Sequence, residues 1–247
     1  MINMRFSKYI RRSIVQFAAL FYSSRKSKVI FYHDLHSDHV YSDMSTHIDL
    51  FRKHINIIRD LNYEIVSEIT KSKGQIQICF DDGFSGIYDN IEVIKELQIY
   101  VTLFVITNSI DEAGFLSKNQ LIDLSLFPYI NIQSHTHTHS RLNSVNEHKL
   151  QWELEYSKKI LEKMLNIKID SLCFPEGRYN DKVMATASKC GYNKLYSSLP
   201  GFYYISYMDK IINRSLVQSA NEDEFISILK GGDNILYYWY KLKHKRR

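Results

Sequence analysis

The stretch Ile76-Gln77-Ile78-Cys79-Phe80-Asp81-Asp82-Gly83 joins an alternating apolar pattern to a pair of adjacent carboxylates. The alternation over residues 76–80 predicts a β-strand. An Asp-Asp-Gly sequence is by itself a common turn, because Asp and Gly both suit tight turns. The two carboxylates therefore indicate chemistry only if the fold brings other polar groups to the same strand end.

A second polar run, Ser134-His135-Thr136-His137-Thr138-His139, follows another apolar stretch. One carboxylate plus two imidazoles is the ligand set of a mononuclear hydrolytic metal site with open coordination positions. The second carboxylate is then spare, and beside a water held by the metal it would act as a general base. Zinc is the default ion for one such divalent site, and cobalt, nickel or manganese would also fit.

Strand-like apolar runs alternate with helical patterns along the chain. Strands are expected at 29–33, 76–80, 101–106, 130–133, 172–174, 194–197 and 215–217, and helices at 46–61, 87–97, 147–165, 182–189 and 222–229. Repeated strand–helix units predict a parallel sheet, and about seven units favour an α/β barrel over an open sheet. In such barrels the reactive groups lie at strand ends, and Asp81, His135 and Pro175 all fall at the carboxyl ends of expected strands.

Together these motifs resemble those of the NodB-homology polysaccharide deacetylases. The family's Thr/Ser-Phe-Asp-Asp-Gly and His-(Ser/Thr)-x-x-His motifs read here Cys79-Phe80-Asp81-Asp82-Gly83 and His135-Thr136-His137-Thr138-His139. Its Pro-aromatic-Gly element corresponds to Pro175-Glu176-Gly177, in which Glu176 replaces the usual aromatic residue. The resemblance covers roughly residues 28–231 and implies a single domain, a distorted (β/α) barrel of about seven strands.

The resemblance also implies roles for individual residues. Asp82, His135 and His139 would bind the metal, and Asp81 would be the general base. His137 occupies the variable position of its motif and is expected not to bind the metal. The residues of the third motif would contact the substrate and stabilise the oxyanion. They are Pro175, Glu176 with its backbone N–H, Arg178 and Tyr179.

The general acid departs from the commonest family pattern, in which a histidine of a late strand supplies it. After His148 the only histidine is His244, in the basic tail. The biofilm poly-N-acetylglucosamine deacetylases, the branch closest in motif order, take this histidine from an N-terminal Tyr-His pattern, which Tyr32-His33 fits. The resemblance therefore points to His33, with His36 and His39 as rivals in the same loop.

The family's arginine before the third motif, which orients the catalytic aspartate, is also missing. Cys173 stands in its place. Arg178 and Arg214 are the two candidates to replace it, although either residue would also suit an ordinary surface ion pair.

The function implied by the resemblance is metal-dependent removal of acetyl from an N-acetylated amino sugar in a cell-surface polysaccharide or its precursor. Two alternatives stay open: hydrolysis of an O-acetyl ester or a non-sugar amide, and a catalytically inactive glycan-binding barrel. The net charge of +5 is mostly terminal. A nucleic-acid-binding role is disfavoured, because such proteins carry a basic stripe with stacking aromatics within their fold.

The chain divides into a basic amphipathic segment (1–27), the barrel (28–232) and a basic aromatic tail (233–247). Ile10, Ile14, Phe17 and Phe21 share one helical face, and the apolar stretch is too short to span a bilayer. This pattern favours an interfacial helix on an anionic membrane. We expect a cytoplasmic protein, peripheral at the inner face of the membrane, that acts on a glycan or a lipid-linked sugar. A signal anchor with export, or a helix packed on the domain, are the alternatives.

Overall fold

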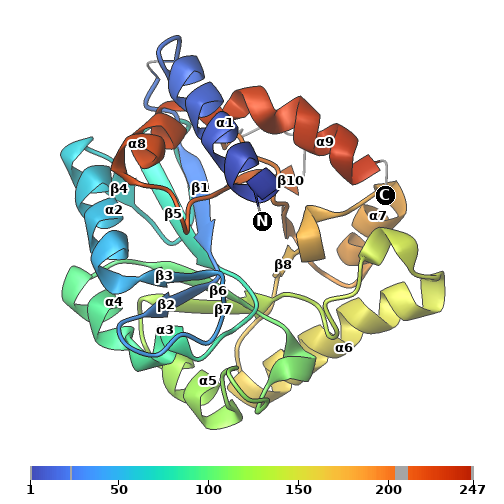
Figure 1. Ribbon diagram of the computed structural model, residues 1–247. Coiled ribbons are helices and arrows are strands. Elements are labelled where there is room, and N and C mark those ends of the chain that lie inside the picture. The colour runs from blue at the N-terminus through green and yellow to red at the C-terminus, as the bar shows by residue number, and fades with distance from the viewer. Residues whose placement is uncertain (1, 23, 204–210, 246–247) are drawn as a thin grey trace.

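The computed structural model describes residues 2–22, 24–203 and 211–245, and its centre is a row of parallel strands ringed by helices (Figure 1). The hydrogen-bonded strand order is β10-β9-β8-β7-β6-β5-β1-β11, and every neighbouring pair is parallel. These strands are β1 (Lys28–Tyr32), β5 (Gln75–Phe80), β6 (Val101–Val105), β7 (Ile130–Ser134), β8 (Ser171–Cys173), β9 (Lys194–Tyr196), β10 (Ile211–Ile212) and β11 (Arg214–Leu216).

A single short segment closes this row into a barrel. β10 and β11 are separated only by Asn213; β10 pairs with β9, and β11 pairs with β1. The segment therefore joins the two outermost strands and counts as one position, which gives seven positions around the barrel. This confirms the expected distorted (β/α) barrel. Outside it, β4 (Glu64–Ile65) pairs with β5, and β2 (Asp34–His36) pairs with β3 (Ser45–His47) as a separate parallel sheet.

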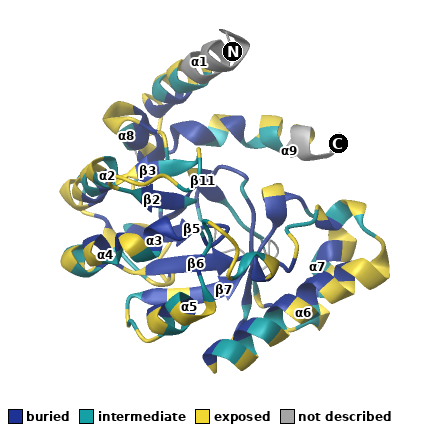
Figure 2. Cartoon of the chain, turned by 60° about the horizontal axis from the view of Figure 1, so that its bottom comes forward, coloured by how far each residue is buried: buried dark blue, intermediate teal, exposed yellow. Residues whose placement is uncertain are grey.

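The helices that surround the barrel expose their outer faces and bury the side toward the strands (Figure 2). They are α2 (Ile48–Asp60), α3 (Gly86–Asp89), α4 (Ile91–Leu97), α5 (Lys118–Ser125), α6 (Glu147–Leu165), α7 (Asp181–Lys189) and α8 (Glu222–Lys230). Side-chain caps at Ser117, Asn146, Asn180 and Asn221 accept backbone N–H bonds and fix four of the helix starts. The single helix expected at 87–97 is instead two short helices that meet at Asn90.

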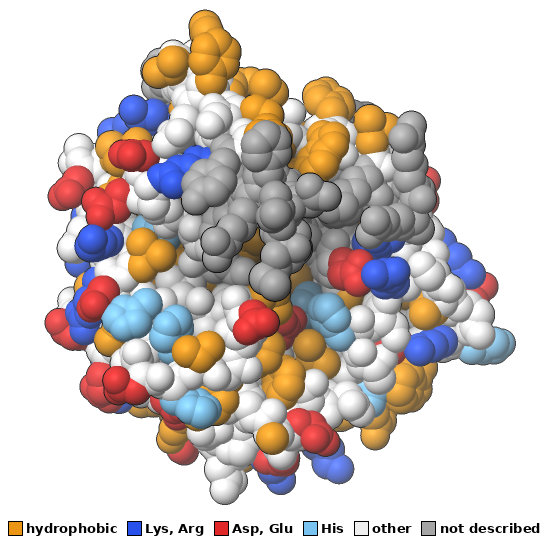
Figure 3. Space-filling model, viewed as in Figure 1, with side chains coloured by type: hydrophobic (Ala, Val, Ile, Leu, Met, Phe, Trp, Pro, Cys, Tyr) orange, Lys and Arg blue, Asp and Glu red, His pale blue; other side chains and the backbone are white. Residues whose placement is uncertain are grey.

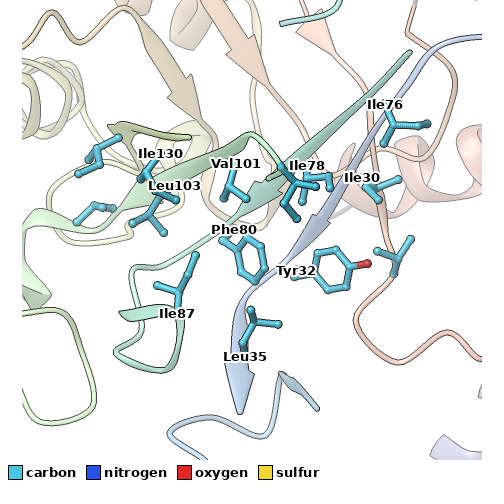
Figure 4. Close-up of a cluster of buried hydrophobic side chains, with 14 of the residues drawn as sticks. Ile30, Tyr32, Leu35, Ile76, Ile78, Phe80, Ile87, Val101, Leu103 and Ile130 are labelled. Atoms are coloured by element: carbon cyan, nitrogen blue, oxygen red, sulfur yellow. The ribbon is translucent and has the colours of Figure 1, made fainter. Parts of the chain in front are cut away.

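Alternation along the strands divides the core into two clusters. Ile30, Tyr32, Ile78, Phe80 and Leu103 belong to the large cluster that packs against the helices (Figure 4). The residues between them point to the other face of each strand, which in a barrel is the interior. There a smaller cluster is formed by Val29, Phe31, Ile69, Cys79, Phe104, Cys173 and Tyr196.

Both terminal helices lie on the same side of the barrel (Figures 1 and 2). α1 (Ile2–Ala19) buries Val15, Ala18 and Ala19 against the fold. A Cβ added to Gly232 would lie 2.1 Å from the Val15 carbonyl oxygen, so this close approach requires glycine. Among the described helices, none has the length and apolarity needed to cross a membrane.

The C-terminal boundary expected at 232/233 falls inside one element. The 3₁₀ helix η4 (Gly232–Leu236) continues into α9 (Tyr237–Lys245). Within η4, the Asp233 carboxylate lies 2.7 Å from Lys28 Nζ of β1, and both side chains are buried. The start of the tail is therefore fixed to the first strand of the barrel.

Candidate active site

Several strands of the barrel deliver polar side chains to one rim. Asp81 and Asp82 follow β5, His135 follows β7, and His33 follows β1. Together with His139 they line one cleft of about 310 Å³, a volume at the lower end of the range for small-molecule sites. Histidine and acidic side chains lie near each other around the middle of this face in Figure 3. The convergence follows from the parallel sheet, whose strands all end at the same rim.

Asp82, His135 and His139 form a group whose spacing fits one metal ion. Asp82 Oδ1 lies 3.3 Å from His135 Nε2 and 3.7 Å from His139 Nε2. Two ligand atoms bound tetrahedrally to one zinc ion are about 3.4 Å apart, so the three residues are placed as ligands would be. Burial lowers the pKa of His139 to about 4, which keeps its imidazole in the neutral form that binds metals.

His135 is oriented by a backbone partner. Its Nδ1–H donates to the Cys173 carbonyl oxygen at 2.9 Å, so that Nε2 faces Asp82. A bond of this kind fixes the tautomer and the ring orientation of a metal-binding histidine. The sequence alone does not identify this acceptor, because Cys173 comes close only when β7 pairs with β8.

The loop that carries the histidines is held by a buried carboxylate of α6. Glu153, fully buried, accepts the backbone N–H groups of His137 and Thr138 at 3.0 and 2.8 Å, and the Thr138 hydroxyl also donates to it. Thr136 and His139 adopt left-handed backbone angles, with φ of 70° and 56°. Sequence reasoning missed Glu153; the available signal was an acid on the buried face of an amphipathic helix.

His137 points away from the metal group. Its Nδ1 lies 2.8 Å from the Thr107 hydroxyl oxygen, and its ring meets Trp152 and Tyr156 edge to face at 4.8 and 4.7 Å. These contacts place it against α6. The arrangement agrees with the expectation that His137 is not a ligand.

Arg214 takes the place of the missing family arginine. Its two terminal nitrogens each lie 2.7 Å from one oxygen of Asp81, and its Nε donates to the Ser197 carbonyl oxygen. The other candidate, Arg178, pairs instead with Glu176. Burial alone would raise the pKa of Asp81, but the Arg214 guanidinium outweighs burial and holds this pKa at about 2. Asp81 is therefore an anion at neutral pH.

Asp81, His135 and Cys173 form a second group with metal-ligand side chains. It suits a metal less well, because Arg214 already occupies both Asp81 oxygens. Burial also raises the pKa of the Cys173 thiol, and a thiol binds metals as the thiolate. The first group, with Asp82 and His139, is therefore the better metal site.

Among the three rival histidines, His33 is the one that lines the cleft. Its Nδ1 lies 2.5 Å from Gln218 Oε1, so that Nε2 is left to exchange a proton. His36 bonds to the Ser45 hydroxyl at 2.9 Å, and His39 packs on Tyr41. Neither is among the described residues that line the cleft. Gln218 carries no sequence signal, because its role depends on β11 lying beside β1.

The third motif forms the 3₁₀ helix η3 (Pro175–Gly177), in which Glu176 has a left-handed φ of 54°. Glu176 lines the cleft, and its carboxylate pairs with Arg141 and Arg178 at 2.9 Å each. Pro175 and Arg178 are buried, and Tyr179 stacks on Phe174. These three residues support the turn and are not part of the cleft lining in the described chain.

The terminal elements contribute cleft residues that the sequence did not predict. Arg11 of α1, Leu236 of η4 and Tyr240 of α9 line the same cleft as the metal group. Arg11 is fixed by an ion pair with Glu224 of α8 at 2.8 Å. These residues are far apart in sequence and meet only because α1 packs beside η4.

Comparison with protein families matches residues 68–195 to the model described as "Polysaccharide deacetylase". The chain is similar to "Putative polysaccharide deacetylase YxkH" of Bacillus subtilis, with 29% identity over 162 residues, 61% of this chain and 58% of that protein. It is also similar to the poly-beta-1,6-N-acetyl-D-glucosamine N-deacetylase of Staphylococcus epidermidis, with 31% identity over 133 residues. That match covers 48% of this chain and 46% of the relative, so the chain spans only about half the length of these two proteins.

Among solved structures, the fold resembles that of Streptococcus pyogenes deacetylase PplD in complex with acetate. The TM-score is 0.72, with 21% sequence identity, and the match covers 82% of this chain and 97% of that one. At this level of identity the likeness supports the fold.

Proposed function

The chain belongs to the polysaccharide deacetylase family, and on this basis we propose that it is a metal-dependent hydrolase that removes acetyl from an N-acetylated amino sugar. The substrate would be a cell-surface glycan or its precursor. The observation that carries the proposal is the meeting of Asp81, Asp82, His135 and His139 at one rim of the barrel, with Asp81 held in ionised form by Arg214.

Asp82, His135 and His139 would hold one divalent ion, zinc by default, which supplies Lewis acidity toward the amide carbonyl and lowers the pKa of a water. Asp81 accepts the proton of the attacking water. Because Arg214 binds both of its oxygens, Asp81 is fixed in orientation and stays ionised at neutral pH. Each carboxylate oxygen has a second lone pair, so Asp81 can still accept a proton while Arg214 holds it in place.

The second proton transfer completes the hydrolysis. The amine leaves from the tetrahedral centre only when its nitrogen is protonated, which requires a general acid. His33 lines the cleft and donates Nδ1–H to Gln218, so in its imidazolium form its Nε2–H would deliver that proton as the C–N bond breaks, leaving the ring neutral. The negative oxygen formed on attack would be stabilised by the backbone N–H of Glu176.

Acetate release tests the proposal. The substrates are poly-N-acetylglucosamine, chitooligosaccharides and lipid-linked N-acetylhexosamines, each incubated with zinc-loaded wild type and Asp81→Asn. We expect turnover by the wild type and a decrease of about 10³-fold in Asp81→Asn, with bound zinc unchanged by elemental analysis. No acetate from any amino sugar, despite one bound zinc per chain, would overturn the proposal.

His33→Ala distinguishes an amide from an ester substrate. An amine leaving group needs the general acid, whereas an alkoxide leaving group needs it much less. On an N-acetyl substrate we expect His33→Ala to be about 10²-fold slower than wild type. If it keeps nearly full activity and the wild type prefers O-acetyl esters, the substrate is an ester.

A further inference from the structure

Large apolar side chains are exposed on the two terminal helices and the residues that adjoin them. Figure 3 shows them along the upper edge of the molecule, over α1 and α9. We call this set the terminal apolar surface; it consists of Ile10, Ile14, Phe17, Leu20, Phe21, Ile235, Tyr238, Trp239 and Leu242. The most exposed are Leu20 at 78%, and Phe21 and Tyr238 at 75% each. Clustered exposure of this kind marks an interaction site, whereas single exposed apolar residues are ordinary.

The exposed face of α1 is not the face that holds the helix in place. Val15, Ala18 and Ala19 are buried, and α1 approaches η4 so closely that only glycine fits at 232. Ile10, Ile14 and Phe17 lie on an adjoining side of the helix, at intervals of four and three residues, and are exposed. The helix therefore packs on the domain and also presents a second apolar face outward.

The charge of the two helices favours one kind of partner. The sequences of α1 and α9 contain seven Lys and Arg residues and no Asp or Glu. Without these two helices, acidic residues would outnumber basic ones in the chain, which has 32 Lys and Arg and 27 Asp and Glu. A second copy docked face to face would bring like charges together, which is unfavourable. An anionic lipid surface instead offers headgroups for the cations and an apolar boundary for Phe and Leu.

The aromatic composition of α9 supports the same partner. Tyr and Trp are enriched at membrane–water interfaces, because their rings are apolar and carry one polar atom. α9 opens with Tyr237-Tyr238-Trp239-Tyr240, and Tyr238 and Trp239 are exposed.

We propose that the terminal apolar surface docks on an anionic lipid bilayer and holds the active-site cleft beside it. Arg11, Leu236 and Tyr240 of the same elements line the cleft, so docking would bring its rim next to the lipid headgroups. Docking itself does not depend on the proposed function. Its consequence, that the amino sugar is presented at a lipid surface, does rest on that function.

Sedimentation with vesicles tests the docking. The full chain is mixed with vesicles of phosphatidylcholine, with or without phosphatidylglycerol, and the bound fraction is measured. We expect binding to the anionic vesicles that decreases with added salt. The triple substitution Phe17→Ser, Leu20→Ser, Phe21→Ser should weaken this binding at least about tenfold, because three large apolar groups are removed from the interface.

A matched control is available at Leu126, just after α5, which is exposed to the same 78% as Leu20. Leu126→Ser should bind anionic vesicles as the wild type does, whereas Leu20→Ser should bind more weakly. Far-UV circular dichroism checks that each variant is folded, and Trp239→Ala with Leu242→Ser provides an independent variant on α9. Asp81→Asn should bind vesicles like the wild type, so a failure of catalysis would not be mistaken for a failure of docking.

The proposal is overturned if the wild type does not bind anionic vesicles, or if Leu20→Ser and Leu126→Ser weaken binding equally. It is also overturned if light scattering shows a wild-type dimer that the triple variant converts to a monomer while vesicle binding is absent. In that case the surface would be an interface between two copies of the chain.

Discussion

Charged side chains are buried at the rim of the barrel, whereas large apolar side chains are exposed on the terminal helices. Both regions reverse the usual distribution, and such reversals are more informative than ordinary burial. At the rim, the buried Asp81 and Glu153 each bind identified partners, Arg214 and the histidine loop. On the terminal helices, by contrast, the exposed apolar side chains form one cluster at the surface. The difference indicates that these two buried carboxylates are satisfied within the fold, whereas the terminal surface is suited to an external partner.

The largest expected effect is the difference in bound zinc and turnover between variants of His135 and His137, two histidines of one motif. His135→Ala removes a side chain whose Nε2 lies 3.3 Å from Asp82, and it should reduce both bound zinc and acetate release to background. His137→Ala removes a ring that contacts Thr107 and Trp152 instead, and it should keep zinc and most activity. Elemental analysis and turnover of the two variants give the comparison. Equal loss of zinc in both would mean that the metal site is assigned to the wrong residues.

Two arginines provide the next comparison. Arg214→Ala leaves the buried Asp81 carboxylate without its partner, which should reduce the free energy of unfolding by about 3–5 kcal/mol. Arg178→Ala interrupts a pair with the half-exposed Glu176, which retains Arg141, and should cost less. Urea unfolding measures both. If Arg178→Ala is the more destabilising variant, the buried pair at Asp81 does not have the importance assigned to it.

A buried histidine outside the active site, His54, predicts that the free energy of unfolding depends on pH. His54 is enclosed between the Tyr32 hydroxyl and the Ala220 carbonyl oxygen, and burial lowers its pKa to about 4. The unfolded chain therefore takes up the proton first as pH falls. The stability that the neutral ring contributes is present above pH 6.5 and lost between about 6.5 and 4, by about 3 kcal/mol in all.

The measurement is the free energy of unfolding across this pH range for wild type and His54→Gln. The variant should be less stable near neutral pH but should show a smaller decrease on acidification. Parallel curves for the two proteins would show that another group controls the pH dependence.

Replacing Glu153 should have a smaller effect on stability and a clear effect on zinc affinity. Glu153→Gln keeps the size of the side chain but weakens its bonds to the His137 and Thr138 N–H groups. Because it orients the loop that carries two metal-binding positions, we expect zinc affinity to fall about 10–100-fold. Zinc titration with a competing chelator measures this. An unchanged affinity would mean that the left-handed turns at Thr136 and His139 hold the loop without Glu153.

The regular part of the fold was predictable because it depends on local pattern. The alternation over residues 76–80 and the long periodic run at Glu147–Leu165 identify β5 and α6 with almost the observed limits. The helix break at Asn90 and the strand β10 were missed, whereas β11, expected at 215–217, is observed at Arg214–Leu216. β10 has only two residues, too few for any periodicity.

The residues of the candidate site also fall into two groups, those that the sequence reveals and those that only the fold reveals. Asp81, Asp82, His135 and His139 are recognisable because the motif keeps them close in sequence to their strand ends. Their supports are harder to identify. Gln218 and Arg214 reach the site from distant segments, and Glu153 is marked only as an acid on the buried face of α6. For Arg214 the missing arginine at position 173 gave two candidates, and only the packing of β11 beside β1 chooses between them.

The smallest expected change in stability is also the sharpest test of the two regions. Leu20→Ser alters a side chain that is 78% exposed, so the free energy of unfolding should stay within about 0.5 kcal/mol of wild type. Its vesicle binding should nevertheless fall, whereas Leu126→Ser should leave both quantities unchanged. A marked loss of stability in Leu20→Ser would show that Leu20 contributes to the packing of the fold. The terminal surface would then not differ from the rim in the way described. Retained stability with weakened binding would show that the terminal surface serves a partner and not the fold.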